Sequence, residues 1–182
     1  MRVQPLPADQ WDDAVDTSLS AMLPPERRTP EGAGNLLSTL ARHPPLAGAF
    51  LRFGGYLLTN STLPPRVREQ AILRVAHRRG CAYEWTHHVS IARKAGLSES
   101  EIAAARTGEA DDPFDRAVFG AVDELDGGSN LSDQTWAALS GRLDERQRMD
   151  FVFTVGGYAG LAMALNTFGV ELENSEPDGP QR

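Results

Sequence analysis

Three side chains that can exchange protons or act as nucleophiles fall on one face of a short segment near the middle of the chain. Cys81, Glu84 and His88 are spaced i, i+3 and i+7, which places them on one stripe if the segment is helical. Cys81 is the only cysteine of the 182 residues. A thiol, a carboxylate and an imidazole can serve as nucleophile, general acid and general base. We therefore expect the functional site on this segment.

The position of Cys81 at the head of this predicted helix bears on its reactivity. The helix dipole and the free N–H groups of a first turn favour the thiolate form. The alternative is a small buried cysteine that packs like an alanine. Glu84 and His88 are four residues apart, so Glu84 either hydrogen-bonds and orients the imidazole or forms only a weak surface pair with it. Because the three groups share a face, we expect them to line a pocket.

A fourth candidate, Glu69, lies on the preceding predicted helix. Its face also carries three apolar residues, Ile72, Leu73 and Ala76. Burial of a carboxyl raises its pKa unless a partner compensates, and a raised pKa suits proton transfer near neutral pH. A surface position at the edge of the apolar stripe, or an ion pair with a nearby arginine, is an equally good interpretation. Weaker candidates for contacts with a substrate lie on the same segment as Cys81, namely Tyr83, Trp85 and His87.

Helix start and stop signals are frequent and strand signals are poor, so the sequence predicts an all-α fold. Predicted helices cover residues 8–22, 35–43, 46–60, 66–79, 81–95, 98–106, 113–126, 132–140 and 144–168. Ser98 and Glu101 fit a capping box, and Pro113 fits a first helical position. We expect a single helical domain over residues 1–172, with a core at about 45–125, and a disordered tail at 173–182.

The overall composition limits the possible partners. Hydrophobic residues make up 41% of the chain and charged residues 24%, which is ordinary for a soluble globular protein. The formal net charge of -7 argues against nucleic acid or an anionic membrane surface as the main partner. One cysteine cannot form an internal disulfide, and the N-terminus lacks the apolar run of a signal peptide. We therefore expect a cytoplasmic protein.

The segment 151–170 contains no charged residue and is long enough to span a bilayer. It also contains four glycines and several polar side chains, which is unusual for a confident span. We expect a buried helix, central to the fold or to a subunit interface, and no contact with a membrane.

The reactive segment also carries side chains that can bind a metal ion. Glu69, Cys81, Glu84, His87 and His88 are all competent ligands, but their spacing matches no closed zinc motif and no His-Glu-x-x-His sequence is present. We expect no metal and no cofactor, and a small molecule as the substrate.

Three runs of residues resemble a known family. The runs at residues 68–76, 80–88 and 95–98 are similar to the carboxymuconolactone decarboxylase superfamily, whose other branch is the alkylhydroperoxidase D proteins. The resemblance covers about residues 50–110. It implies an all-helical fold of the alkylhydroperoxidase D-like type and a homo-oligomer, a trimer or a hexamer. The predicted helices before residue 45 are additional to the minimal family core.

The resemblance assigns roles to individual residues. The peroxidase branch has a glutamate, a Cys-x-x-Cys pair and a histidine four residues after the second cysteine. Glu69 takes the place of the glutamate, Cys81 that of the first cysteine and His88 that of the histidine. Glu84 occupies the second cysteine position and Tyr83 the position of another histidine, so the dithiol cycle of that branch cannot run within this chain. The Glu84 and His88 pair is more similar to the decarboxylase branch.

Three functions follow from these observations. The first is cofactor-free acid–base chemistry on a small carboxylated or lactone-type molecule, with Glu69, Glu84 and His88 as the proton-transfer groups. The second is a thiol-dependent peroxidase that uses the single Cys81. The third is a non-catalytic oligomeric module in which the reactive stripe belongs to the core and to an interface.

Overall fold

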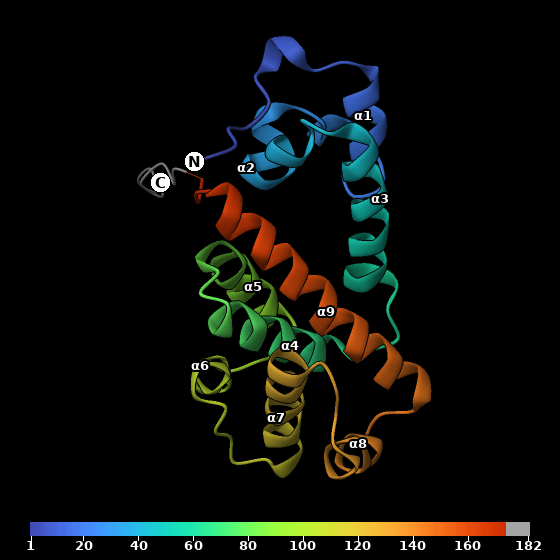
Figure 1. Cartoon of the computed structure of the whole chain (residues 1–182), viewed down its shortest axis with the longest axis vertical. Coiled ribbons are helices and arrows are strands. Elements are labelled where there is room, and N and C mark those ends of the chain that lie inside the picture. Colours follow the sequence, from blue (N-terminus) through green and yellow to red (C-terminus); the bar gives the residue numbers. More distant parts are fainter. Residues whose placement is uncertain (174–182) are drawn as a thin grey trace, which may run out of the picture. The chain divides into compact units, whose positions relative to one another are not determined.

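A computed structural model describes residues 1–173 of the chain. Within this part the protein consists of helices and contains no strand (Figure 1). The helices are α1 (Asp13–Leu19), α2 (Pro30–Leu40), α3 (Pro44–Gly55), α4 (Pro65–Arg78), α5 (Ala82–Lys94), α6 (Glu99–Thr107), α7 (Pro113–Gly128), α8 (Asp133–Ser140) and α9 (Glu145–Phe168). The described part also contains two short 3-10 helices, Ala8–Gln10 and Pro25–Arg27, and one π-helical turn, Tyr56–Asn60. The predicted all-α fold is confirmed.

The helices group into two compact units. The first contains Met1–Gly55 and the residues from Thr167 onward, and the second contains Tyr56–Asn166. The single domain expected from the sequence stays a prediction, and each unit is described by itself. Most of the tail expected at 173–182 lies outside the described residues.

In the first unit, α1 and α2 both pack against α3. Predicted and observed helices differ most here. The helix expected at 8–22 is interrupted, because Trp11 has an extended backbone and Asp12 caps a separate helix by accepting from the Val15 N–H at 2.9 Å. The loop expected before residue 35 is largely helical, since Thr29 caps a helix that opens with Pro30. The core of this unit is apolar: Leu6, Val15, Leu19, Leu23, Leu37, Leu40, Ala47 and Leu51.

In the second unit, α4 is the central helix and contacts α5, α6 and α7. Pro65 opens it, a position where a missing N–H costs nothing. Every residue from Glu69 to Ala76 is buried, so α4 has no solvent face along two turns. Buried polar side chains on such a helix need partners, and Glu69 and Arg74 have them, whereas Gln70 has none among the described residues. The apolar core around it is Val67, Ala71, Ile72, Val75, Val118, Ala121, Val122, Leu139, Phe151 and Val155.

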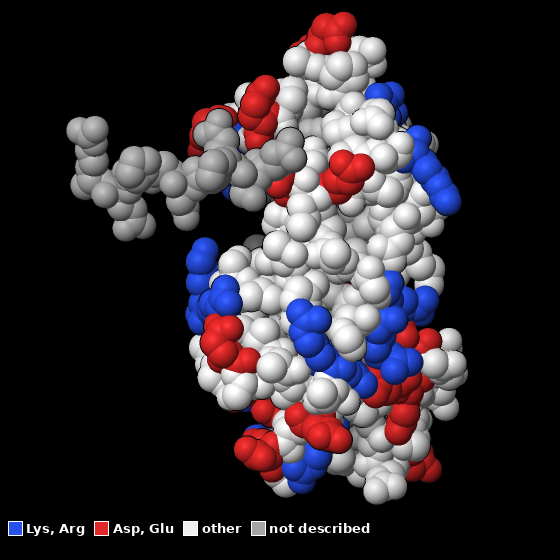
Figure 2. All heavy atoms as spheres, turned by 90° about the vertical axis from the view of Figure 1, so that its left-hand side faces the viewer, with Lys and Arg blue, Asp and Glu red and all other residues white. Residues whose placement is uncertain are grey.

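Ion pairs fasten α4 to its neighbours. Arg66 contacts Asp115 at 2.9 and 2.7 Å, and Arg74 contacts Asp123 at 2.8 and 2.7 Å. Both arginines therefore bind a carboxylate of α7 through two N–H groups, the strongest geometry for such a pair. On the face shown in Figure 2, acidic and basic side chains lie intermingled over the helices of this unit.

The end of α6 is fixed by a glycine. Gly108 caps this helix with a φ of 79°. A Cβ atom at Gly108 would lie 3.0 Å from Nη2 of Arg74, so both the backbone conformation and the space favour glycine. Arg74 also donates to the carbonyls of Ala105 at 3.2 Å and Arg106 at 2.8 Å. The last turn of α6 is thereby held against α4.

The long helix α9 contributes to the core of the second unit. Phe151, Val155 and Tyr158 pack with α4 residues such as Ile72 and Val75. By length and composition α9 could also cross a membrane, a test that the core helices of soluble proteins pass as well, and 39% of its apolar window is buried.

Candidate active site

The two consecutive helices predicted from the sequence carry the candidate residues. Glu69 lies on α4, Cys81 is the residue that immediately precedes α5, and Glu84 and His88 lie on α5. The two helices pack against each other in the second unit. All four side chains are buried, with exposed fractions of 0% for Glu69, 1% for Cys81, 3% for Glu84 and 8% for His88. The structure therefore places them inside the fold and not on a solvated surface.

Glu69 and His88 form a buried pair between the two helices. Nδ1 of His88 lies 2.7 Å from Oε2 of Glu69, and Nε of Arg68 donates to Oε1 of Glu69 at 3.0 Å. Each carboxylate oxygen therefore has its own partner, which is how a fully buried carboxylate is stabilised. With Nδ1 occupied by Glu69, the other ring nitrogen of His88 is left for proton exchange.

The predicted contact between Glu84 and His88 is wrong. Neither carboxyl oxygen of Glu84 has a hydrogen-bond partner among the described residues, and His88 takes its partner from α4 instead. Burial raises the pKa of Glu84 to about 8, and the neighbouring Cys81 thiol acts in the opposite direction. Glu84 is therefore a protonated carboxylic acid at neutral pH, and it can donate a proton.

The expectation of a Cys81 thiolate is also wrong. Burial raises the pKa of Cys81 to about 12, and the Glu84 carboxyl raises it further. The backbone N–H groups of Tyr83 and Glu84 act in the favourable direction expected of a helix start, but they are outweighed. Cys81 is a neutral thiol in the resting protein, because desolvation exceeds the effect of the helix dipole.

Tyr158 of α9, which no sequence pattern indicated, also contacts the site. Its ring packs edge-on against the His88 imidazole, with 5.0 Å between the ring centroids. Tyr158 is 8% exposed, and burial together with the carboxyls of Glu69 and Glu84 raises its pKa. The only hint in the sequence was a tyrosine inside the uncharged segment 151–170.

The weaker candidates fall in two places. Tyr83 is buried and its ring lies 4.3 Å from that of His87, which is exposed. Trp85 is half-buried and contacts two basic side chains. The Arg106 guanidinium lies 3.9 Å from the centre of the Trp85 ring, and the His77 ring packs edge-on at 6.2 Å.

A pocket of about 270 Å³ opens beside Cys81. It is lined by Ala76, His77, Gly80, Cys81, Ala82, Trp85, Thr86 and Arg106. Cys81 is thus the residue that both lines this pocket and neighbours the Glu84 carboxyl. Glu69, Glu84 and His88 do not line it. The sequence had predicted one pocket lined by all the reactive side chains, and this pocket is lined by Cys81 alone among them.

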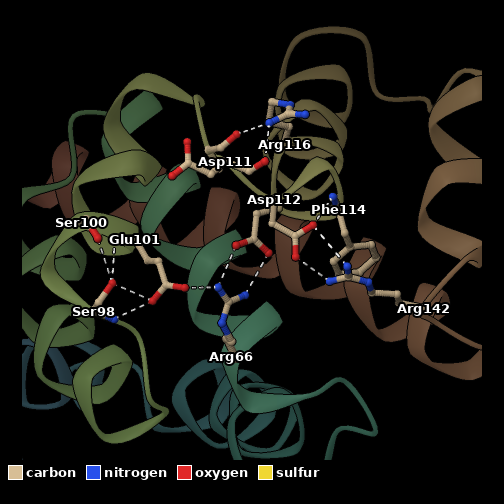
Figure 3. A network of polar contacts seen from close by, with 11 residues as sticks. Arg66, Ser98, Ser100, Glu101, Asp111, Asp112, Phe114, Arg116 and Arg142 are labelled. Carbon is tan, nitrogen blue, oxygen red and sulfur yellow. Dashed lines mark hydrogen bonds and ion pairs between the residues drawn. The ribbon is translucent and has the colours of Figure 1, made fainter.

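A second pocket, of about 380 Å³, lies between α6 and α7 and is rich in carboxylates. Figure 3 shows Arg66 at its centre, pointing toward Glu101, which it contacts at 2.5 Å. Glu101 also accepts from the Ser98 N–H at 2.7 Å, and the predicted capping box is confirmed. Arg66, Glu101 and Asp115 of this pocket therefore stabilise the start of α6 and the contact between α4 and α7. Among residues 1–173 no group of three or more His, Cys, Asp and Glu side chains could hold a metal ion.

The matched family and the fold agree with the resemblance noted in the sequence. Residues 44–126 match the carboxymuconolactone decarboxylase family. The matched segment is less than half of the chain, contains Glu69, Cys81, Glu84 and His88, and supports the resemblance to the carboxymuconolactone decarboxylase and alkylhydroperoxidase D-like superfamily. No curated protein sequence matches the chain.

Solved structures show the same fold at low identity. A protein with an alkylhydroperoxidase AhpD core from Ralstonia eutropha JMP134, described as peroxidase-related, aligns with a TM-score of 0.73 and 18% identity over 96% of this chain and 94% of that one. A putative antioxidant defence protein AhpD from Agrobacterium tumefaciens aligns with a TM-score of 0.66 and 20% identity, over 73% of this chain and 94% of that one. The debrominase Bmp8 aligns with a TM-score of 0.72 and 16% identity, over 94% and 92% of the two chains.

Proposed function

We propose that the protein is an enzyme that performs cofactor-free acid–base chemistry on a small carboxylated or lactone-type organic molecule. The observation that carries this proposal is the Glu84 carboxyl, which is 3% exposed, has the Cys81 thiol as its polar neighbour and has its pKa raised by burial to about 8. Close by, His88 is oriented by Glu69 as a separate proton-exchanging group. The two carboxyls therefore have different roles: Glu84 is the proton donor, and Glu69 orients His88 for proton exchange.

The proposed reaction is a decarboxylation or a related proton transfer. As the carboxylate leaves as CO₂, the electron pair of the broken C–C bond moves into a conjugated carbonyl of the substrate. The Cys81 thiol, which lines the pocket, then donates its proton to the carbanionic carbon, and the adjacent Glu84 carboxyl replaces the proton on the thiol. His88 returns a proton from solvent to Glu84, so the protein ends in its starting state.

Turnover of carboxylated lactones, followed as CO₂ release, tests this function. We expect Glu84→Gln and His88→Ala to lower kcat by about 100-fold or more, the range of a lost general acid or base. Cys81→Ser should keep much of the activity, because a hydroxyl can also pass a proton. Equal turnover by wild type, Glu84→Gln and His88→Ala would refute the proposal.

A thiol-dependent peroxidase is the second candidate, and one observation favours it. Cys81 is among the residues that line an open pocket large enough for a small oxidant, although the side chain itself is buried. Among proteins of similar fold, a cysteine-to-alanine variant of Bmp8 was crystallised with 2,3,4-tribromopyrrole. Peroxide consumption that requires both Cys81 and an added thiol reductant would support this candidate. A Cys81 thiol that persists after peroxide treatment would exclude it.

A homo-oligomer, a trimer or a hexamer, is part of the proposal. It is supported by exposed apolar side chains on α9, Met149, Phe153 and Met163, each more than half exposed. Light scattering of the purified protein measures the oligomeric state directly. A monodisperse monomer would contradict this part, and it would leave the proposed chemistry standing.

A further inference from the structure

We propose that the pocket beside Cys81 is an anion-binding subsite, in which Arg106 and His77 recognise the negatively charged group of a small organic carboxylate. The inference deepens the proposed function, because it names the residues that bind the charged part of the substrate. Neither residue belongs to the reactive stripe, and the sequence analysis assigned Arg106 no role.

The charge of the pocket is the first argument. The chain carries a net charge of -7, yet the ionisable side chains that line this pocket are His77, Arg106 and the neutral thiol of Cys81, with no acidic residue among them. A local excess of positive charge in an acidic protein attracts anions and repels cations. The pocket also lies at the start of α5, where the helix dipole is positive.

The state of Arg106 is the second argument. Within residues 1–173 its guanidinium forms no ion pair, as is also true of Arg148, so no described carboxylate neutralises its charge. It is instead held 3.9 Å above the Trp85 ring. A stacked guanidinium keeps its N–H edge free and loses little side-chain entropy on binding, which suits bidentate contact with a carboxylate.

The scaffold behind Arg106 is the third argument. The carbonyl of Arg106 accepts a hydrogen bond from Arg74 at 2.8 Å, and Gly108 ends the helix directly afterwards. The backbone that carries the cation is therefore fixed to the central helix. Ala76, Ala82 and Trp85 supply apolar wall, and a pocket of 270 Å³ suits a molecule of about one ring.

The test uses benzoate as the probe and benzamide as its neutral counterpart. Binding is followed by NMR at the indole N–H of Trp85, one of three tryptophans, assigned with Trp85→Phe. We expect saturable shifts with benzoate and none with benzamide. Arg106→Gln should weaken benzoate binding roughly tenfold or more, the effect of losing a charge-assisted hydrogen bond. His77→Gln should weaken it less.

Arg148→Gln is a matched control, because Arg148 also lies over a tryptophan, Trp136, at 4.2 Å, and does not line the pocket. It should leave benzoate binding unchanged. Equal binding of benzoate and benzamide, no shift at about 50 mM benzoate, or unchanged affinity in Arg106→Gln would each overturn the inference. These outcomes are independent of turnover. Benzoate binding that needs Arg106 would stand even if the variants at Glu84 and His88 kept full activity.

Discussion

The His88 imidazole is oriented from the neighbouring helix, by Glu69 of α4, across 2.7 Å between Nδ1 and Oε2. Glu84, which lies one turn before His88 on the same helix, does not pair with it and has the Cys81 thiol as its polar neighbour. The site therefore contains one carboxyl that is committed to structure and one that is free for chemistry. Each of the following predictions depends on this division or on the scaffold that maintains it.

Removing the Glu69 carboxylate should destabilise the protein strongly. Glu69→Ala leaves Arg68 and His88 without their buried partner, and breaking a buried ion pair from one side costs about 3 kcal/mol or more. Glu69→Gln keeps the shape and should cost less. Urea denaturation measures both losses. Glu99→Ala, which breaks an exposed pair with Arg93, is the control and should change stability little. Similar stabilities of Glu69→Ala and the control would contradict the buried pair.

The stability of the protein should fall as the pH rises through the neutral range. The pKa of Glu84 is about 8 in the folded protein, above the value of about 4.3 of an exposed glutamate. Between these pH values the unfolded chain releases a proton that the folded protein retains. The free energy of unfolding should therefore decrease from about pH 4 to about pH 8, by at most roughly 5 kcal/mol from this group.

Glu84→Gln separates this effect from all other titrations. Glutamine cannot ionise, so the variant should lose this component of the pH dependence and should gain stability over wild type above pH 8. Denaturation midpoints of both proteins between pH 5 and pH 9 measure the difference. Parallel curves for wild type and Glu84→Gln would show that Glu84 is ionised in the folded state.

Cys81 should react slowly with alkylating reagents. A thiol with a pKa of about 12 has a very small thiolate fraction at pH 8, and thiolate is the reactive form. We expect iodoacetamide to modify the folded protein at least about 100-fold more slowly than free cysteine, with a rate that keeps rising above pH 9. Mass spectrometry follows the reaction at the single cysteine. The urea-unfolded protein should react at the rate of free cysteine, and a plateau below pH 9 in the folded protein would indicate a thiolate.

Arg74→Lys should loosen the end of α6. Lysine carries the same charge but cannot bind Asp123 with two N–H groups and also reach the carbonyls of Ala105 and Arg106. We expect a stability loss of about 1 to 3 kcal/mol and faster amide exchange at residues 105–108. Arg93→Lys, in an exposed pair, is the matched control. Unchanged exchange in Arg74→Lys would show that α6 is held by its apolar contacts.

Local patterns predicted most of the helices correctly. The boundaries of the helices from 66 onward differ by one or two residues from the observed ones, because Pro65, Ser98, Pro113 and Ser132 are strong start signals. The first unit was less predictable. Two prolines, Pro30 and Pro44, open helices there, whereas the sequence had indicated a loop and a helix end.

The site was predicted in its residues but not in its contacts. The i, i+4 spacing allowed a hydrogen bond between Glu84 and His88, but it gave no sign that Glu69 of the neighbouring helix would bind Nδ1 of His88 instead. The pKa of Cys81 depends on burial, which the helix-dipole argument did not include. Tyr158 and Arg106 reach the site from distant helices, and no local pattern indicates such contacts.

Gly108 has no side chain that could contact a substrate, but its lack of a Cβ atom leaves room for the Arg74 guanidinium. Alanine at this position would push against the guanidinium that anchors the last turn of α6. A shift of this last turn would also displace the Arg106 guanidinium from its position above the Trp85 ring. The affinity for an anionic ligand would then change although residue 108 does not contact the ligand. Gly108 should therefore be included among the positions that determine ligand recognition.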